Sequence, residues 1–333
     1  MKLSRVGEKH LIERIRGLVG NPPKEVLLGI GDDAAVFQRR PGFLTVLTTD
    51  ALVEGIHFNP TYTPPDSLGW KSLASNVSDV AAMGGIPQYA VVSLAIPRDW
   101  EIGWVESFYR GMIRCGKGCG CAIVGGDTVE SKSGLFVSLA VVGEVKKNSV
   151  VTRRGAKQKD LLCVLGDVGK SRAGLELLEK GIHDRRFSRC VRHFLEPPIR
   201  LHEIQTLIAQ YRVSSMIDVS DGLASEVVHL SEESGSGCVV WEDRIPVDPE
   251  ALLWAHEHDR PRSLYSLDSG EEYTVLFTLN PREYRRMEAA MKTGKGGSIT
   301  AIGEMTGPGE PLLVQKDGKQ EPLVSSGWDH FVS

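Results

Sequence analysis

Asn76-Val77-Ser78-Asp79-Val80-Ala81-Ala82-Met83-Gly84 sets a single carboxylate among small and apolar residues. The stretch ends an amphipathic pattern that predicts a helix over residues 66–83. A carboxylate among Val77, Val80 and the two alanines would be largely buried, and a buried charge needs a partner. A metal ion is one such partner, so Asp79 is a candidate metal ligand.

Further acidic residues recur in short segments rich in Gly, Ser and Thr, far apart in the sequence. These segments are Gly29-Ile30-Gly31-Asp32-Asp33, Thr48-Thr49-Asp50, Gly125-Gly126-Asp127-Thr128 and Asp218-Val219-Ser220-Asp221-Gly222. Most of them follow an apolar run of β-forming residues, at the point where a strand would end. Glycine lets a backbone or a phosphate approach closely, and a helix that begins at Gly222 would offer backbone N–H donors suited to phosphate.

A surface turn or a helix cap explains any one of these segments, because Asp favours both positions. With Asp79 included, that explanation must succeed five times independently. Mg²⁺ prefers oxygen ligands and is usually shared between one or two carboxylates and substrate phosphates. The sequence therefore predicts an enzyme that uses a nucleotide and several Mg²⁺ ions.

The composition indicates an ordinary globular protein of 333 residues, which is long enough for two domains. The net charge of −4 provides no basic surface for nucleic acid. No apolar run approaches the roughly 18 residues of a membrane span, and the N-terminus has no signal-peptide pattern. We expect a cytoplasmic protein whose six cysteines are reduced and structural, including Cys115, Cys119 and Cys121.

Hydrophobic periodicity predicts interleaved helices and strands, which is typical of an α/β (α+β) fold. Helices are predicted over residues 8–19, 66–83, 100–115, 171–179, 199–211 and 222–234. Strands are predicted over residues 43–49, 89–96, 121–125, 134–145, 161–165, 213–217, 237–241, 273–279 and 298–304. The polar stretch Lys146-Lys147-Asn148-Ser149 predicts a boundary between domains 1–147 and 148–333.

Two glycine-containing loops resemble nucleotide-binding motifs without matching them. Gly166-Asp167-Val168-Gly169-Lys170-Ser171 has two residues between its first Gly and the Gly-Lys-Ser, where a P-loop needs four. It is better explained as a tight strand-to-helix turn. Gly29 and Gly31 lack the third glycine of a dinucleotide-binding fingerprint.

The segments taken together resemble the thiamine-monophosphate kinases. These belong to a superfamily of ATP-using enzymes with aminoimidazole ribonucleotide synthetase, selenophosphate synthetase and a hydrogenase maturation protein. Besides the acidic segments, the matching strings are Gly55-Ile56-His57-Phe58, Thr152-Arg153-Arg154-Gly155-Ala156, Gly270-Glu271-Glu272-Tyr273 and Gly327-Trp328-Asp329-His330-Phe331. The resemblance implies an N-terminal α/β domain that forms a homodimer, a C-terminal α/β domain, and an ATP site between them.

The resemblance also implies a role for each matching residue. The Mg²⁺ ligands would be Asp33, Thr48, Thr49, Asp50, Asp79, Asp127, Asp218 and Asp221. ATP would contact Gly126, Asp127, Arg153, Ser220 and, by a looser match, Tyr109. Thiamine monophosphate would contact His57, Glu271 and Trp328, although a C-terminal Trp packed on the core is the alternative for Trp328.

The implied reaction converts ATP and thiamine monophosphate to ADP and thiamine diphosphate. The acceptor is a phosphate monoester that is largely dianionic at neutral pH, so no general base is expected among the catalytic groups. One departure concerns the substrate end, because family members commonly have Gly and Asp where this chain has Ser269 and Glu272. Another enzyme of the superfamily, a non-catalytic nucleotide-binding protein and a structural module are the alternatives.

Overall fold

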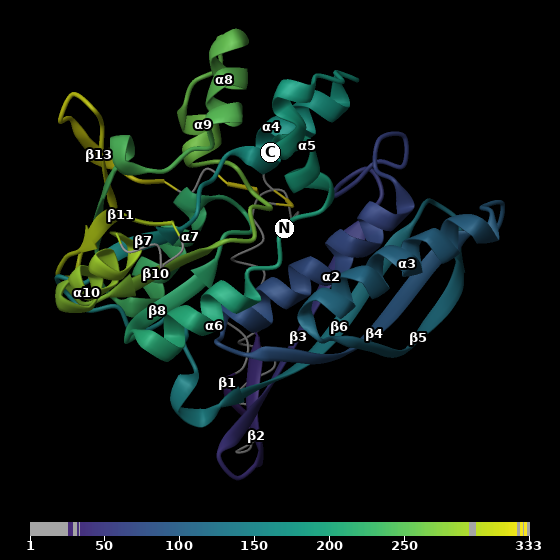
Figure 1. The fold of residues 1–333 in the computed structure, drawn as a ribbon, viewed down its shortest axis with the longest axis horizontal. Helices are drawn as coiled ribbons and strands as arrows, with labels where there is room; N and C mark the ends of the chain where they lie inside the picture. Colours follow the sequence, from purple (N-terminus) through teal and green to yellow (C-terminus); the bar gives the residue numbers. More distant parts are fainter. Residues whose placement is uncertain are drawn as a thin grey trace.

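The computed structural model describes residues 26–28, 32, 34–292, 298–324, 327–328 and 330–331. Within these residues two β-sheets lie side by side, and helix α2 (Pro65–Ala82) runs along the border between them (Figure 1). The predicted helix over residues 8–19 and the candidate ligand Asp33 lie outside the described residues. No helix among the described residues is both long enough and apolar enough to span a bilayer.

The first sheet has the strand order β1-β2-β3-β6-β4-β5. Its strands are β1 (Val26–Leu28), β2 (Ala35–Arg40), β3 (Phe43–Val53), β4 (Ile86–Pro97), β5 (Ala122–Ser131) and β6 (Phe136–Lys146). The β4–β5 pair is parallel and the other pairs are antiparallel. Helices α2 and α3 (Ile102–Cys119) cover one face (Figure 1). Strand β4 alternates accordingly, with Val92 and Leu94 buried and Val91 and Ser93 exposed.

Two glycines explain how closely α2 and α3 pack. A Cβ atom on Gly69 would lie 1.9 Å from the carbonyl oxygen of Phe108, and one on Gly111 would lie 1.7 Å from that of Asp66. Neither position accepts a side chain, so the two helix backbones touch directly. This contact fixes α2 on the sheet and with it the polar residues that α2 carries.

The second sheet has the strand order β13-β12-β9-β11-β7-β10-β8. Its strands are β7 (Leu161–Leu165), β8 (Val213–Asp218), β9 (Cys238–Trp241), β10 (Val275–Leu279), β11 (Ile299–Met305), β12 (Leu312–Val314) and β13 (Gln320–Pro322). The helices of this half are α4 (Lys170–Glu179), α5 (Ser188–Leu195), α6 (Leu201–Gln210), α7 (Leu223–Ser234), α8 (Pro249–Glu257), α9 (Ser263–Ser266) and α10 (Pro281–Lys292). All five residues of β10 are buried, because elements cover both of its faces.

The two halves share a core as well as a chain connection. Ala81 and Ala82 at the end of α2 pack with Met216 and Phe277 of the second sheet. The side-chain amide of Gln205 on α6 donates to the carbonyls that follow α2, at 3.0 and 2.9 Å. The C-terminal end of α2 is therefore packed against the second sheet, and the residues that follow it are hydrogen-bonded to α6.

The structure confirms a strand or helix at each predicted range that it describes, but it corrects where two strands end. Strand β3 continues to Val53 and β5 continues to Ser131, so Asp50 and Asp127 lie inside strands and not beyond them. Pairing with β6 and β4 carries the ladder through these polar residues. The periodicity also missed β1, β2, β12, β13, α5, α8, α9 and α10, most of which are short.

Candidate active site

Three polar residues form a stripe along one face of α2. Lys71, Ser75 and Asp79 are spaced by four residues, and such residues are neighbours on a helix surface. Oδ2 of Asp79 accepts a hydrogen bond of 2.6 Å from the hydroxyl of Thr48 on β3. Nζ of Lys71 lies 2.7 Å from Oε2 of Glu271 in the second half of the chain. The stripe thus connects α2 to both sheets.

Asp50 on β3 lies beside the middle of this stripe. Burial raises the pKa of the Asp50 carboxyl, and a hydrogen bond from the Ser75 side chain opposes the rise only in part. A cation at this carboxylate would offset the cost of burying its charge. Asp50 and Thr48 both project from the face that α2 covers, since they are two residues apart on one strand.

The end of β8 meets α2 from the opposite side. Asp218 is the last residue of β8 and is 2% exposed, and its Oδ2 accepts a hydrogen bond of 2.7 Å from the hydroxyl of Ser78. Ser78 directly precedes Asp79. The C-terminal end of α2 therefore brings together a carboxylate from each half of the chain, Asp79 and Asp218.

A buried tyrosine shows that the acids converge. The pKa of the Tyr273 hydroxyl is raised well above its usual value, first by burial and then by the negative charges of Glu271, Asp50, Asp218 and Asp79. These four carboxylates come from three elements and a turn. Together with the Thr48–Asp79 and Ser78–Asp218 hydrogen bonds, this influence indicates that Asp50, Asp79 and Asp218 lie in one region, and their use as metal ligands stays a prediction.

The turn after β8 is used differently from the prediction. Oε1 of the buried Glu226 accepts hydrogen bonds from the amides of Ser220 and Asp221, at 3.4 and 3.0 Å, and the amide of Ala224 donates to the Leu267 carbonyl. These three amides are engaged within the chain and do not offer donors to a phosphate. Two of these amides precede α7, so phosphate binding at the N-terminus of this helix stays a prediction.

The candidate ligands of the first sheet lie on two different faces. Asp127 is level with Ser93 and Ser138 across β5, β4 and β6, and this row projects from the exposed face of the sheet. Thr49 lies on the same face, where its hydroxyl donates to the Leu139 carbonyl at 2.7 Å and lies 3.4 Å from the Ser138 hydroxyl. Thr49 and Asp127 therefore point away from Thr48 and Asp50.

Glycine is required next to Asp127. A Cβ atom on Gly126 would lie 2.1 Å from the Val92 carbonyl oxygen of the neighbouring strand. Glycine is therefore needed for the close approach of β5 to β4 at this position. The Asp127 carboxylate itself is exposed and accepts a hydrogen bond of 2.9 Å from the Thr128 amide.

Tyr109 lines a cavity of about 500 Å³ between α3 and the start of β5. The cavity wall is largely apolar and includes Tyr109, Ile113, Gly116, Cys121, Ala122 and Ile123. Burial raises the pKa of the Tyr109 hydroxyl. Strand β5 leads from this cavity to Gly126 and Asp127, so a flat group in the cavity could continue into phosphates along the strand.

Two histidines and a tryptophan gather beyond Glu271. The ring of His57 lies 4.9 Å from that of His330, and Nε1 of Trp328 donates to Nδ1 of His330 at 3.2 Å. Burial, followed by the nearby His330 and Lys71, lowers the pKa of His57 to about 4. Trp328 is 55% exposed, which is against core packing, and its amide donates to the Asp221 carbonyl at 3.0 Å.

Arg153 lies in the connection between the two halves. It follows Thr152, whose carbonyl accepts a hydrogen bond from the Met216 amide on β8, and its own carbonyl accepts one from the Ser234 hydroxyl at the end of α7. The Arg153 backbone therefore lies close to Met216 of β8. Met216 is two residues before Asp218, which ends this strand.

The sequence prediction missed Lys71 and Glu226, and it gave no role to Tyr273, His330 and Glu272 although they stand in the matching strings. A signal for Lys71 was present, because Lys71, Ser75 and Asp79 repeat every four residues on an otherwise buried helix. Ser269 and Glu272, the two residues that differ from the common family pattern, contact each other. The Ser269 hydroxyl donates a hydrogen bond to Oε1 of Glu272 at 2.6 Å. They form one local unit.

The donor set suits Mg²⁺, although the carboxylates form no closed cage. The side chains are oxygen donors, as Mg²⁺ prefers, and Asp50 has a burial cost that a cation would offset. Among the described residues, no three His, Cys, Asp or Glu side chains are grouped closely enough to hold an ion alone. Mg²⁺ usually keeps waters and binds one or two carboxylates together with phosphates, so this open arrangement is compatible with it.

Known proteins share this sequence and fold. The family model described as AIR synthase related protein, N-terminal domain, matches residues 31–145. The thiamine-monophosphate kinase of Aquifex aeolicus is 36% identical over 99% of this chain and all of its own length, and that of Escherichia coli K12 is 33% identical over 98% of this chain and 99% of its own. A solved structure, AaThiL complexed with AMPPCP and TMP, covers 99% of both chains with a TM-score of 0.87 and 32% identity. The chain therefore belongs to the thiamine-monophosphate kinase family and has the two-sheet AIR synthase-like fold.

Proposed function

We propose that this protein transfers the terminal phosphoryl group of ATP to thiamine monophosphate, giving ADP and thiamine diphosphate. The observation that carries the proposal is the polar stripe of α2. Its Asp79 end lies near the carboxylates of Asp50 and Asp218, and its other end carries Lys71, which pairs with Glu271. The Asp79 end of the stripe suits a metal ion with phosphates, and the Lys71–Glu271 end suits a cationic organic acceptor.

The chemistry requires positioning more than proton transfer. The acceptor phosphate is already largely dianionic at neutral pH and is a nucleophile without a base. Two anions must approach each other in line, so their charge must be neutralised. When bound, Mg²⁺ supplies that neutralisation and orients the phosphates. Thr48, Asp50, Asp79, Asp218 and Asp221 are the residues that would hold it.

The nucleotide would lie along β5. Tyr109 and the apolar cavity beside it would take the base, and the bare backbone at Gly126 would let the phosphates lie against the strand. Asp127 projects from the opposite face of β5, which is the edge strand, and it would share a metal with those phosphates at the edge of the sheet. Arg153 would add a fixed positive group, and the Ser220 hydroxyl would be a further contact.

The part of the site that binds thiamine monophosphate would contact it through one carboxylate and through uncharged aromatic rings. Glu271 pairs with Lys71, whose charge also influences His57, and His57 is uncharged at neutral pH because its pKa is about 4. A neutral ring beside a cationic thiazolium avoids like-charge repulsion. Trp328 would offer its exposed ring to the cation, a contact worth about 0.5–2 kcal/mol.

We also infer a homodimer built on the exposed face of the first sheet, and two domains over residues 1–147 and 148–333. That face carries large apolar side chains, namely Leu47, Tyr89, Val91, Val129 and Phe136, with exposures between 37% and 52%. Contiguous exposed apolar side chains are typical of interaction surfaces. Thr49 and Asp127 lie on this same face, so a second copy of the chain would complete their surroundings.

The test is a direct assay with purified protein, ATP, Mg²⁺ and thiamine monophosphate. Formation of thiamine diphosphate and ADP in equal amounts is expected, and it should stop when EDTA removes Mg²⁺. Hydrolysis of ATP without thiamine diphosphate would reject the assignment. Sedimentation of Val91→Asp, which should shift the protein from dimer to monomer, tests the proposed interface.

A further inference from the structure

The loop Gly166–Ser171, which resembles a shortened P-loop, is already bound to an anion from its own chain. Oε1 of Glu272 accepts hydrogen bonds from the amides of Gly169 and Ser171 at 2.7 and 3.0 Å, and from the Ser269 hydroxyl at 2.6 Å. Gly169 has a φ of +95°, which favours glycine. The helix α4 that begins here would attract an anion at its N-terminus, and Glu272 occupies that position.

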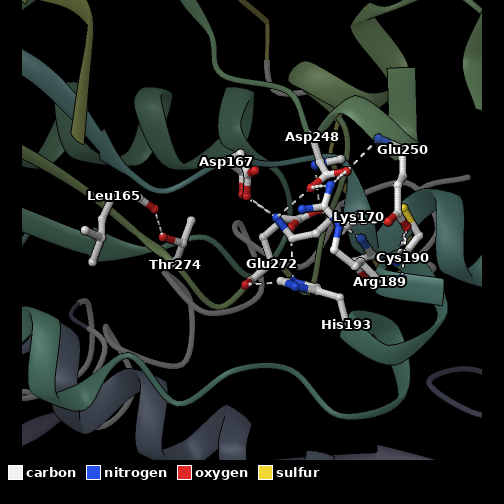
Figure 2. A network of polar contacts seen from close by, with 12 residues as sticks. Leu165, Asp167, Lys170, Arg189, Cys190, His193, Asp248, Glu250, Glu272 and Thr274 are labelled. Atoms are coloured by element: carbon white, nitrogen blue, oxygen red, sulfur yellow. Dashed lines mark hydrogen bonds and ion pairs between the residues drawn. The ribbon is translucent and has the colours of Figure 1, made fainter. Parts of the chain in front are cut away.

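The other carboxylate oxygen of Glu272 faces α5. Nε2 of His193 lies 3.1 Å from Oε2 of Glu272, as an ion-pair contact, and it is hydrogen-bonded to the backbone carbonyl oxygen of Glu272 at 3.2 Å (Figure 2). Glu272 is fully buried. Burial by itself raises the pKa of this carboxyl, but His193, Lys170 and Ser269 together hold it below the ordinary value. A charged carboxylate is thus anchored to two helices at once.

The residues on either side of Glu272 have an unusual backbone. Glu271 has a φ of +55° and Tyr273 a φ of +46°, although neither is glycine. Such conformations are unfavourable for residues with a side chain and persist only where the surroundings enforce them. The amides of both residues donate to the chain after β8, to the Ser220 carbonyl at 2.6 Å and the Val219 carbonyl at 2.9 Å. The anchored Glu272 between them completes the constraint.

The side chains of the turn Glu271–Tyr273 point in different directions. Glu272 points toward α4 and α5, whereas Glu271 reaches Lys71. Lys71 is 1% exposed and its Nζ lies 3.8 Å from the ring centre of Phe194, the neighbour of His193 on α5. One segment of α5 therefore supports both Glu272 and the partner of Glu271.

We propose that Glu272 is a positioning residue. Through its bonds to the start of α4 and to His193, it fixes the carboxylate of Glu271 against Lys71 in the one orientation that receives the organic cation of the acceptor. The proposal rests on the proposed function and deepens it, because it identifies what sets the affinity for the acceptor as distinct from ATP. Glu272 touches no substrate itself.

The experiment is a double-mutant cycle on the intact protein, with Glu272→Gln, Glu271→Gln and the double variant. Glu272→Gln should raise the KM for thiamine monophosphate about tenfold, with the KM for ATP changed less than about twofold. In the double variant, Glu272→Gln should add little to the effect of Glu271→Gln, because it acts through that residue. The matched control is Glu250→Gln, which removes a carboxylate of the same polar network (Figure 2) that pairs with Arg189 at 2.7 Å, and should leave both KM values unchanged.

Equal increases in both KM values, or independent effects in the double variant, would overturn the proposal and leave Glu272 a structural residue. Ser269→Ala removes a single hydrogen bond and is the milder variant if Glu272→Gln does not fold. It should raise the acceptor KM about threefold and spare that for ATP, and unchanged values in folded protein would also count against the proposal. A wild-type protein that forms no thiamine diphosphate would reject the proposed function itself, which is a separate outcome.

Discussion

The hydroxyl of Ser78 donates a hydrogen bond of 2.7 Å to Oδ2 of Asp218, and both residues are buried. The two residues are 140 positions apart and belong to α2 and β8, which lie on different sides of the border between the sheets. The bond therefore joins the two halves next to the converging acids. Its loss should weaken the docking of α2 on the second sheet.

Ser78→Ala tests this connection. A hydrogen bond to a charged group contributes about 1.5–3 kcal/mol, so the free energy of unfolding should fall by about that amount. Urea denaturation measures it. The control is Ser72→Ala, because Ser72 on the same helix donates only to the Leu68 carbonyl within α2. An equal loss in both variants would mean that Ser78 contributes only as a helix residue.

The sequence was sufficient for α2 and for the segment around Asp218, because local signals decide both. The helix pattern in residues 76–84 required only neighbouring residues, and Asp79 lies on the predicted helix, although it is half-buried and not largely buried as expected. The run before Asp218 is a strand, as its apolar residues predict. Both acids belong to the group around Tyr273.

Other parts of the site depend on partners that are distant in the sequence. Whether Asp50 and Asp127 share a face is decided by the register of β3, β6, β4 and β5, which no local pattern shows. Lys71 becomes a site residue only because Glu271, 200 positions away, reaches it. Likewise, Glu226 captures the amides after β8 only once α7 has formed. These contacts required the folded structure.

Asp50→Asn should separate metal binding from stability. The neutral amide removes a charge whose burial is costly, so without Mg²⁺ the melting temperature should remain near that of the wild type. Loss of a metal ligand should slow phosphoryl transfer by on the order of 10²–10³-fold. Glu130→Gln, an exposed carboxylate on β5, is the control and should retain full activity. Normal turnover by Asp50→Asn would remove Asp50 from the metal ligands.

His57 should be neutral throughout the physiological range. Its native pKa is about 4, against about 6.5 in the unfolded chain. The unfolded state therefore binds more protons between these values, and the contribution of His57 to stability is complete above pH 6.5 and is lost as the pH falls toward 4. A ring titration by NMR should have its midpoint near pH 4. The stability difference between wild type and His57→Gln should shrink as the pH is lowered from 7 to 4.5, and a midpoint near 6.5 would contradict the burial of this ring.

Trp328→Ala distinguishes a substrate contact from a packing role. The ring is 55% exposed, its Nε1 donates to His330, and its backbone is held by the Asp221 carbonyl, so removal of the ring leaves the chain anchored. The KM for thiamine monophosphate should rise about 2- to 30-fold, the equivalent of one cation–π contact, and that for ATP should not change. Trp241→Ala, whose ring stacks on Arg244 away from the acids, is the matched control and should alter neither value. Equal changes in both KM values for Trp328→Ala, with a lower melting temperature, would assign Trp328 to packing and leave the recognition of the cation to Glu271.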